Sequence, residues 1–426
     1  MNIVKPINLS KLFELLFFES KKTDGQRLVE LLKNKIPLFM SNVNGYCEEK
    51  LGSGFFGDVV SNTISGSVEV EIKNKKIPMD VAIKKIRSQT GTFDVIKHED
   101  NIIVYSDNEL SCEAIFFMLV SELWIREITP HVPYLIGAGK CDTVSNSNHI
   151  DTAQNISPLK PDTLLINRFV IERHGLLKSI TIHNKGINPF INDVPRITKT
   201  YLNNLMDLMK YVCLNRRHNK ALLPNNIQCD IVELLDGYFI SFLHTAHLLW
   251  KNYKITLLDQ HSRNIFIHWI DKQTYMGTKP LNNIKYIYYK LTNSKNKYIR
   301  IPTFGTLLKI GDLGSCISNP VNNLFIVGDL PQVDDSLKHI HKYKTQLPMY
   351  IDFMLNINFG LPTDIYDQTI IGKIFHQELF KDLVIYDGYM SNVDKYPSPY
   401  DLLLYNPVFD KYRVNSIIDK KNVLII

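Results

Sequence analysis

The sequence lacks the patterns that mark zinc fingers, disulfide frameworks and membrane spans. Its six cysteines include no C-x-x-C pair, so neither a zinc site nor a disulfide framework is expected. Its longest apolar runs, such as residues 115–120, are far shorter than a membrane-spanning helix needs. The N-terminus has no basic stretch followed by an apolar one, so no signal peptide is expected. These absences predict a soluble, intracellular protein without a membrane span.

A strong charge of either sign is also missing. The chain has 49 Lys and Arg against 43 Asp and Glu, a net charge of +6. This excess tolerates an anionic ligand but does not predict nucleic-acid binding. With 45% apolar and 22% charged residues, the composition is that of a folded globular protein. Its 426 residues exceed the usual size of one domain, which favours a bilobal enzyme or two domains.

Apolar residues recur at helical spacing in several parts of the chain. Helices are expected within residues 1–44, at 109–126, at 230–250 and over most of the chain beyond about 345.

Alternating and apolar runs punctuated by Gly and Asn predict strands elsewhere. They are expected within residues 45–90, at 163–171 and as a hairpin over 284–302, whereas 176–228 reads as an irregular, polar insertion. A strand-rich half followed by a helical half makes the chain α+β.

A glycine-rich segment opens the strand-rich half. Gly52, Gly54 and Gly57 match G-x-G-x-x-G, with Ser53 between the first two and Val59 after the third. Glycines allow the backbone to approach phosphate oxygens and to present N–H donors. A dinucleotide-binding fold uses the same spacing but follows it with a helix, whereas an alternating strand follows here. The context favours a phosphate-covering hairpin, with an ordinary glycine-rich hairpin as the alternative.

A lysine on the following strand fits the same chemistry. Residues 81–84 read V-A-I-K, and Lys84 is expected to contact the α- and β-phosphates of a nucleotide. An edge strand with a solvated lysine is the alternative. The gap between the glycines and Lys84 predicts an extra hairpin over residues 61–80.

An acidic residue on the next helix is expected to hold Lys84 in place. Glu113 is favoured, because the helix then continues towards Pro130. Glu122 is the alternative, and it lies on the opposite side of the helix from Glu113. Glu109 shares a helix face with Glu113. A solvated surface charge is the plain explanation for any one of them.

A loop with two polar residues lies between the 230–250 helix and an apolar strand. In residues 257–264, Asp259 and Asn264 have D-x-x-x-x-N spacing, which lets the aspartate orient a hydroxyl while the asparagine binds a metal ion. A short segment further on, Asp312-Leu313-Gly314, supplies a carboxylate that is expected to bind the metal together with Asn264. A D-x-G turn after a strand is common, so the order and context of the motifs carry the hypothesis.

Together these residues resemble the eukaryotic-type protein kinase superfamily over roughly residues 45–420. Within it the chain looks most like divergent kinases of large DNA viruses, of the iridovirus or giant-virus kind. That likeness rests on Ile128-Thr129-Pro130-His131, on a hairpin insert before Asp312 and on the Ile301-Pro302-Thr303 run. The resemblance implies a bilobal fold, with a helical extension at 1–44, an N-lobe at 45–171, a C-lobe at 172–426, and insertions near 176–228 and 268–303.

The resemblance also implies further roles. Asp259 becomes the catalytic base, Asn264 and Asp312 bind the metal, and Asp352 braces the loop around Asp259. The implied adenine site takes Ile171 as gatekeeper, the backbone of Glu172 and His174 at the hinge, Val59 and Ala82 above the ring, and Phe266 below it.

The implied activity is ATP-dependent transfer of the γ-phosphoryl group to protein hydroxyls, with Mg²⁺, or Mn²⁺ as an alternative. Serine or threonine is favoured over tyrosine, but His261 replaces the usual lysine and Arg263 offers a tyrosine-kinase-like charge, so both stay open. The usual His-Arg before Asp259 is Leu257-Leu258, which predicts activity that does not depend on activation-loop phosphorylation. No A-P-E tripeptide occurs between residues 315 and 350.

Two other functions remain as alternatives. The lost His-Arg and A-P-E also suit a pseudokinase that acts as a scaffold or a virion structural protein, and the 176–228 insertion also suits a small-molecule kinase. A viral kinase would act in the host cytoplasm and in the virion. The sequence assigns neither an oligomeric state nor a role for residues 1–44, for which packing on the N-lobe is favoured over partner binding.

Overall fold

A computed structural model describes residues 49–426 apart from 54–56, 62–67, 80, 89–92, 107–108, 142–164, 173–178, 185–195, 202–203, 215–219, 224–226, 273, 293–296, 322–323, 329–343, 345, 382–394 and 420. The helical extension expected at residues 1–44 lies outside the described residues.

An antiparallel sheet of five strands occupies the N-terminal part of the described chain, in the order β1-β2-β5-β9-β8. Its strands are β1 (Glu49–Ser53), β2 (Gly57–Ser61), β5 (Val81–Ser88), β8 (Leu135–Cys141) and β9 (Leu165–Glu172). The central strand, β5, pairs with β2 on one side and with β9 on the other.

An extra hairpin lies between β2 and β5 in the sequence and confirms the one predicted over residues 61–80. It consists of β3 (Val68–Ile72) and β4 (Lys75–Met79). Its turn residues Lys73 and Asn74 both have positive φ angles, of 48° and 64°. Two such residues give the turn whose twist matches that of the flanking antiparallel strands.

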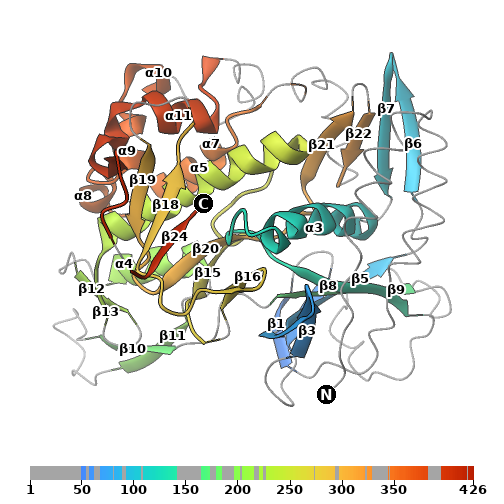
Figure 1. Cartoon of the computed structure of the whole chain (residues 1–426), viewed down its shortest axis with the longest axis horizontal. Coiled ribbons are helices and arrows are strands. Elements are labelled where there is room, and N and C mark those ends of the chain that lie inside the picture. Colours follow the sequence, from blue (N-terminus) through green and yellow to red (C-terminus); the bar gives the residue numbers. More distant parts are fainter. Residues whose placement is uncertain are drawn as a thin grey trace, which may run out of the picture.

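Helix α3 (Glu109–Ile125) lies beside this sheet, as Figure 1 shows. It confirms the helix predicted at 109–126. Its consecutive residues Phe116 and Phe117 point in different directions and are both buried, and a helix that is apolar on several sides belongs in a core. Near its end, Trp124 stacks on Tyr134 with ring centroids 4.9 Å apart.

A second five-stranded sheet joins segments that are far apart in the sequence, in the order β14-β21-β22-β7-β6. Its strands are β6 (Phe93–His98), β7 (Asn101–Ser106), β14 (Ile255–Leu257), β21 (Cys316–Val321) and β22 (Leu324–Val327). Only the β22–β7 pair of this sheet is parallel. In Figure 1, β6, β7, β21 and β22 stand together near α3.

The long helix α5 (Ile231–Tyr253) forms the centre of the C-terminal part. It begins where Asp230 accepts hydrogen bonds from the backbone N–H groups of Val232 and Glu233, an N-terminal cap. It ends at Lys254, whose left-handed conformation has a φ of 54°. The helix predicted at 230–250 is thereby confirmed.

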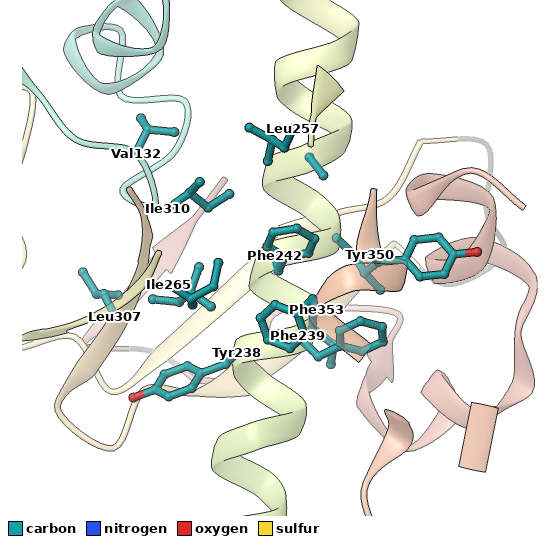
Figure 2. Close-up of a cluster of buried hydrophobic side chains, with 14 of the residues drawn as sticks. Val132, Tyr238, Phe239, Phe242, Leu257, Ile265, Leu307, Ile310, Tyr350 and Phe353 are labelled. Atoms are coloured by element: carbon teal, nitrogen blue, oxygen red, sulfur yellow. The ribbon is translucent and has the colours of Figure 1, made fainter. Parts of the chain in front are cut away.

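Aromatic side chains pack between α5 and the next helices (Figure 2). Phe353 lies 5.5 Å from Phe239 and 4.9 Å from Phe242, measured between ring centroids. All three are essentially fully buried, and each ring contributes about 1.5–3 kcal/mol to the stability of the fold. This cluster packs α5 against α7 (Tyr350–Gly360).

A hairpin of β15 (Ile265–Trp269) and β20 (Thr306–Ile310) follows β14. The chain between its two strands forms β16 (Tyr275–Met276), β17 (Lys279–Pro280), β18 (Tyr286–Lys290) and β19 (Tyr298–Pro302). The β18–β19 pair confirms the hairpin predicted over 284–302.

Two strands from the end of the chain complete a four-stranded sheet, β23-β19-β18-β24. They are β23 (Arg413–Val414) and β24 (Val423–Ile425). Asp419 ties this end down by accepting hydrogen bonds from Arg300 Nε at 2.7 Å and from the hydroxyl of Tyr288 at 2.5 Å. Short strands with intervening polar residues carry little periodic signal, so the sequence did not predict them.

Short helices dominate the chain beyond residue 345, as predicted. They are α7 (Tyr350–Gly360), α8 (Thr363–Tyr366), α9 (Ile370–Phe375), α10 (Glu378–Lys381), α11 (Pro399–Tyr405) and the 3-10 helix η9 (Pro407–Tyr412). Figure 1 shows them alongside α5 and away from the second five-stranded sheet.

The prediction that residues 176–228 are irregular is wrong along the described length of this segment. The segment forms β10 (Ser179–Asn184), β11 (Arg196–Tyr201), α4 (Leu205–Leu214), β12 (Lys220–Leu223) and β13 (Ile227–Asp230). Leu205, Leu208, Met209 and Val212 share one face of α4 and are buried. Their spacing was visible in the sequence, but polar flanking residues obscured it.

The fold class is α+β, as predicted. Among the described residues, no helix combines the length and the apolar composition that crossing a membrane requires.

Candidate functional site

The glycine-rich segment forms a hairpin beside the strand that carries Lys84. In the β1–β2 ladder, Gly52 pairs with Val59 and Ser53 with Asp58, with an irregularity of register just before Gly52. Val59 in turn pairs with Lys84 of β5. The backbones predicted to cover phosphate and to carry the lysine therefore lie on neighbouring strands. Gly54 and the side chain of Lys84 lie outside the described part.

The predicted adenine-site residues meet on the next pair of strands. Ala82 of β5 pairs with Ile171 near the end of β9, and Val81 pairs with Glu172. His174, predicted to continue this site, lies outside the described residues. The strand register brings these positions to one end of β5, but the contacts of their side chains belong to the undescribed part.

Two glutamates were candidates to hold Lys84, and α3 places them in different surroundings. Glu113 is completely buried, whereas Glu122 is only partly buried and its charge acts on Tyr253. Burial raises the pKa of Cys316 well above its usual value, and the nearby charges of Asp312, Glu113 and Asp259 raise it further. The charges of Glu113, Asp259 and Asp312 therefore all act on Cys316, whereas the pairing of Glu113 with Lys84 stays a prediction.

The loop between β14 and β15, residues 257–264, brings Asp259 and Asn264 together. The side-chain Nδ2 of Asn264 donates to the carbonyl oxygen of Asp259 at 2.9 Å, and the N–H of Asn264 donates to the carbonyl of His261 at 2.9 Å. Leu257, at the start of this segment, is buried in the apolar core. Residues with the D-x-x-x-x-N spacing thus form a compact loop, which is closed by hydrogen bonds of Asn264 and begins at the buried Leu257.

Helix α7 and the residue before it form hydrogen bonds to this loop. The carbonyl Oδ1 of Asn356 accepts from the N–H and the hydroxyl of Ser262 at 3.4 and 3.5 Å, while its Nδ2 donates to the carbonyl of Asp352 at 2.8 Å. The N–H of Leu257 lies 3.1 Å from the sulfur of Met349. Sequence reasoning missed Asn356 and Met349. Asn356 lies four residues after Asp352, a helical spacing that could have identified it.

Acidic groups of the site disfavour one another's charge. Burial raises the pKa of Asp259, the imidazole of His261 lowers it, and the charge of Asp312 raises it. The Nε2 atom of His261 lies 3.8 Å from Asp259 Oδ2. Burial also raises the pKa of Asp352 to about 6, with a further contribution from Asp259. Such a group of mutually opposed carboxylates is typical of a site that binds cations or moves protons.

Asp312 follows β20 in an uncommon backbone conformation. Its φ is 49°, a left-handed value that few residues other than glycine adopt, and its side chain is exposed. The preceding Gly311 donates its N–H to the carbonyl of Asn264 at 2.8 Å. This bond connects the Asp312 turn directly to the 257–264 loop. Aspartate is one of the few residues besides glycine that adopt this conformation readily.

A side chain at the position before Asp312 would displace Phe266. A Cβ atom on Gly311 would lie 2.0 Å from the Cε2 atom of Phe266, so the ring would have to move. The ring of Phe266, predicted as the floor of the adenine site, therefore covers Gly311. Sequence reasoning gave no role to Gly311.

The donor atoms here suit a hard divalent cation. Because Nδ2 of Asn264 is used on Asp259, its Oδ1 atom is the one available as a ligand. Together with the exposed carboxylate of Asp312 it offers oxygen ligands, which Mg²⁺ and Mn²⁺ prefer. Among the described residues no group of three or more His, Cys, Asp or Glu could hold a metal alone.

Comparison with known proteins adds no relative. No protein-family model matches the chain, and no curated protein matches it. Function must therefore be inferred from the arrangement of these residues.

Proposed function

We propose that this chain is a protein kinase with a bilobal fold, which transfers the γ-phosphoryl group of ATP to a serine or threonine hydroxyl of a protein. The observation that carries the proposal is the convergence of Asp259, Asn264 and Asp312 around one loop. Asn264 is bonded to the backbone of Asp259, and Gly311, next to Asp312, is bonded to the backbone of Asn264. The strand order β1-β2-β5-β9-β8 supports it further, because it sets the glycine-rich hairpin beside the Lys84 strand.

The roles follow from the chemistry of each group. The β1–β2 hairpin covers the phosphates, and Lys84, held by Glu113, orients them. Asn264 and Asp312 would hold Mg²⁺, which neutralises charge on the phosphates. Asp259 accepts a hydrogen bond from the substrate hydroxyl and then takes its proton. The hydroxyl oxygen forms a bond to the γ-phosphorus as the bond from phosphorus to the β–γ bridging oxygen breaks, and ADP leaves.

The raised pKa of Asp259 fits a proton acceptor. A carboxylate whose charge is disfavoured by burial and by Asp312 binds a proton more readily than an ordinary aspartate. His261 sits at the edge of this group, 3.8 Å from Asp259.

Incubation with ATP and Mg²⁺ tests the proposal, with casein and a basic protein as substrates and mass spectrometry to locate each new phosphate. Phosphoserine or phosphothreonine is expected with the wild type, and none with Asp312→Ala or Lys84→Met. Phosphotyrosine would change the hydroxyl class. Transfer at the wild-type rate in both variants would refute the assigned site.

A thermal-shift titration with ATP-Mg²⁺ separates the alternative functions. Stabilisation together with transfer to protein supports the kinase. No stabilisation and no transfer favour a scaffold, which the Leu257-Leu258 replacement of His-Arg would suit. Stabilisation with transfer only to small molecules favours a small-molecule kinase. The viral origin and the intracellular location stay predictions.

A further inference from the structure

We propose that strand β22 positions Glu113 and Asp312 as one unit, by joining the strand that leads into α3 to the backbone that follows Asp312, so that activity requires no phosphorylation of the chain. The inference rests on the proposed kinase function and adds its regulation. It assigns a positioning role to β22 and to Gly328, neither of which contacts the reacting atoms.

The first connection is the parallel pairing of β22 with β7. Its register runs from Leu324 opposite Ile102 to Val327 opposite Tyr105. The apolar side chains along it are fully buried: Ile103, Phe325, Ile326 and Val327 are at most 1% exposed. Strand β7 ends at Ser106 and α3 begins at Glu109. A shift of β22 would therefore be passed to the start of the helix that carries Glu113.

The second connection is the contact between Gly328, at the end of β22, and Gly314. A Cβ atom on Gly328 would lie 1.8 Å from the carbonyl oxygen of Gly314, so the two backbones touch. The N–H of Gly328 donates to the carbonyl of Cys316 at 2.9 Å. The N–H of Leu258 donates to the carbonyl of Ser315 at 3.1 Å. The backbone that follows Asp312 is thus held between β22 and the 257–264 loop.

The far end of α3 is tied to the C-terminal part as well. Oε1 of Glu127 accepts from the N–H and the hydroxyl of Thr278, in the β16–β17 turn, at 3.2 and 3.0 Å. The N–H of Ile310 donates to the carbonyl of His131 at 2.9 Å, two residues before Asp312. With both ends fixed, α3 cannot swing away from Asp312 unless backbone hydrogen bonds break. In kinases that need activation, ordering of such elements is what phosphorylation supplies.

Gly328→Ala tests the second connection. The added methyl group must displace the carbonyl of Gly314 and with it Asp312. The expected result is a rise of about tenfold in the Mg²⁺ concentration for half-maximal rate, with a lower kcat, because the ligand geometry is lost. Thermal melting with and without ATP-Mg²⁺ reports whether the variant folds.

Two glycine variants serve as matched controls. Gly372→Ala places its Cβ 2.2 Å from the carbonyl of Tyr366, a comparable clash within the C-terminal helices. It should lower the melting temperature and leave the Mg²⁺ dependence within about twofold of wild type. Gly237→Ala, on α5, places its Cβ 3.6 Å from the Cδ1 atom of Ile301, an ordinary contact. It should leave the Mg²⁺ dependence unchanged and keep or raise the melting temperature, because alanine is favoured over glycine inside a helix.

Ile103→Pro tests the first connection without touching the Asp312 turn. Proline in a central strand removes a ladder hydrogen bond. The expected effect is again a raised Mg²⁺ requirement and a lower kcat. Ile182→Pro, in the β10–β11 hairpin at the far end of the molecule (Figure 1), is the control and should leave the Mg²⁺ dependence unchanged.

A wild-type measurement needs no variant: protein treated with phosphatase should keep its full rate. The proposal is overturned if phosphatase treatment lowers the rate by about tenfold or more. It is also overturned if folded Gly328→Ala and Ile103→Pro proteins keep the wild-type Mg²⁺ dependence. In both cases a wild type that transfers phosphate leaves the kinase function standing. A wild type that neither binds ATP-Mg²⁺ nor transfers phosphate contradicts both.

Discussion

Asp236 and Asp259 lie in the same half of the molecule but have opposite surroundings. Asp236, on α5, is fully buried, and both of its oxygens are bonded. It accepts from the N–H of Ile370 at 2.7 Å, from Lys411 at 2.8 Å and from the hydroxyl of Tyr412 at 2.9 Å. Asp259 is half-exposed, and its charged neighbours are His261 at 3.8 Å and a second aspartate.

If the proposed kinase function holds, the difference separates a structural carboxylate, Asp236, from the proton acceptor, Asp259. Burial raises the pKa of Asp236, but three donors offset part of that cost and join α5 to α9 and η9. Burial and the charge of Asp312 raise the pKa of Asp259, and among the described residues only the imidazole of His261 acts to lower it. A carboxylate whose charged form is disfavoured in this way is suited to bind a proton or a cation. Changes at the two residues should therefore act on different quantities.

Asp259→Asn should give the largest effect, which is a loss of activity without a loss of stability. Loss of the proton acceptor should lower kcat by about 10²–10⁴-fold. The melting temperature should stay the same or rise, because the removed charge was disfavoured in the folded state. Initial rates and thermal melting check this. A kcat near that of the wild type would remove Asp259 from the mechanism.

Asp236→Ala should give the reverse result. It leaves Lys411 and the N–H of Ile370 without their acceptor, and should lower the free energy of unfolding by about 3 kcal/mol. The KM for ATP should stay within about twofold of wild type. Asp236→Asn keeps an acceptor for Ile370 and should lose less. Denaturant unfolding measures both, and an unchanged stability would contradict the structural role.

A pH experiment sharpens the contrast with buried groups that stay neutral. Burial lowers the pKa of His244 to about 3, against an ordinary value of 6.5. Below pH 6.5 the unfolded chain therefore binds a proton at His244, whereas the folded chain does not. The contribution of neutral His244 to the free energy of unfolding is present above pH 6.5 and is lost as the pH falls. Relative to His244→Gln, the wild type should lose about 1 kcal/mol of unfolding free energy between pH 6.5 and 5.5. A difference that does not change with pH would contradict this.

Gly311→Ala should give the smallest effect. The methyl group must push the ring of Phe266 away, and the KM for ATP should rise by about threefold if that ring forms the floor of the adenine site. The double variant Gly311→Ala/Phe266→Leu should recover part of the loss, since leucine leaves room for the methyl group. Equal KM values in all three proteins would place Phe266 outside the nucleotide site.

Most long elements could be predicted from the sequence, because their signals are local. The apolar spacing of α5, the hairpin at 284–302 and the D-x-x-x-x-N loop all depend on residues close together in the chain. The pairing of β22 with β7 could not be predicted, since it joins Leu324 to Ile102 and short apolar strands carry no partner information. The Gly328–Gly314 contact is of the same kind.

Within the site, the sequence predicted the residues with chemical roles but not the residues that hold their loop in place. Asp259, Asn264 and Asp312 stand out by spacing, whereas Asn356 contributes through two weak bonds to Ser262 that only the packing of α7 creates. The helix α4 was missed for a different reason, because polar flanking segments hid a short amphipathic pattern.

Transfer of phosphate from γ-labelled ATP by the wild type and by Asp312→Asn, measured side by side with Mg²⁺ present and absent, tests the central claim most directly. The predicted result is labelled protein only with the wild type and only with Mg²⁺, while both proteins melt at similar temperatures. Equal labelling by the two proteins, or no labelling by a folded wild type over a range of protein substrates, would contradict it.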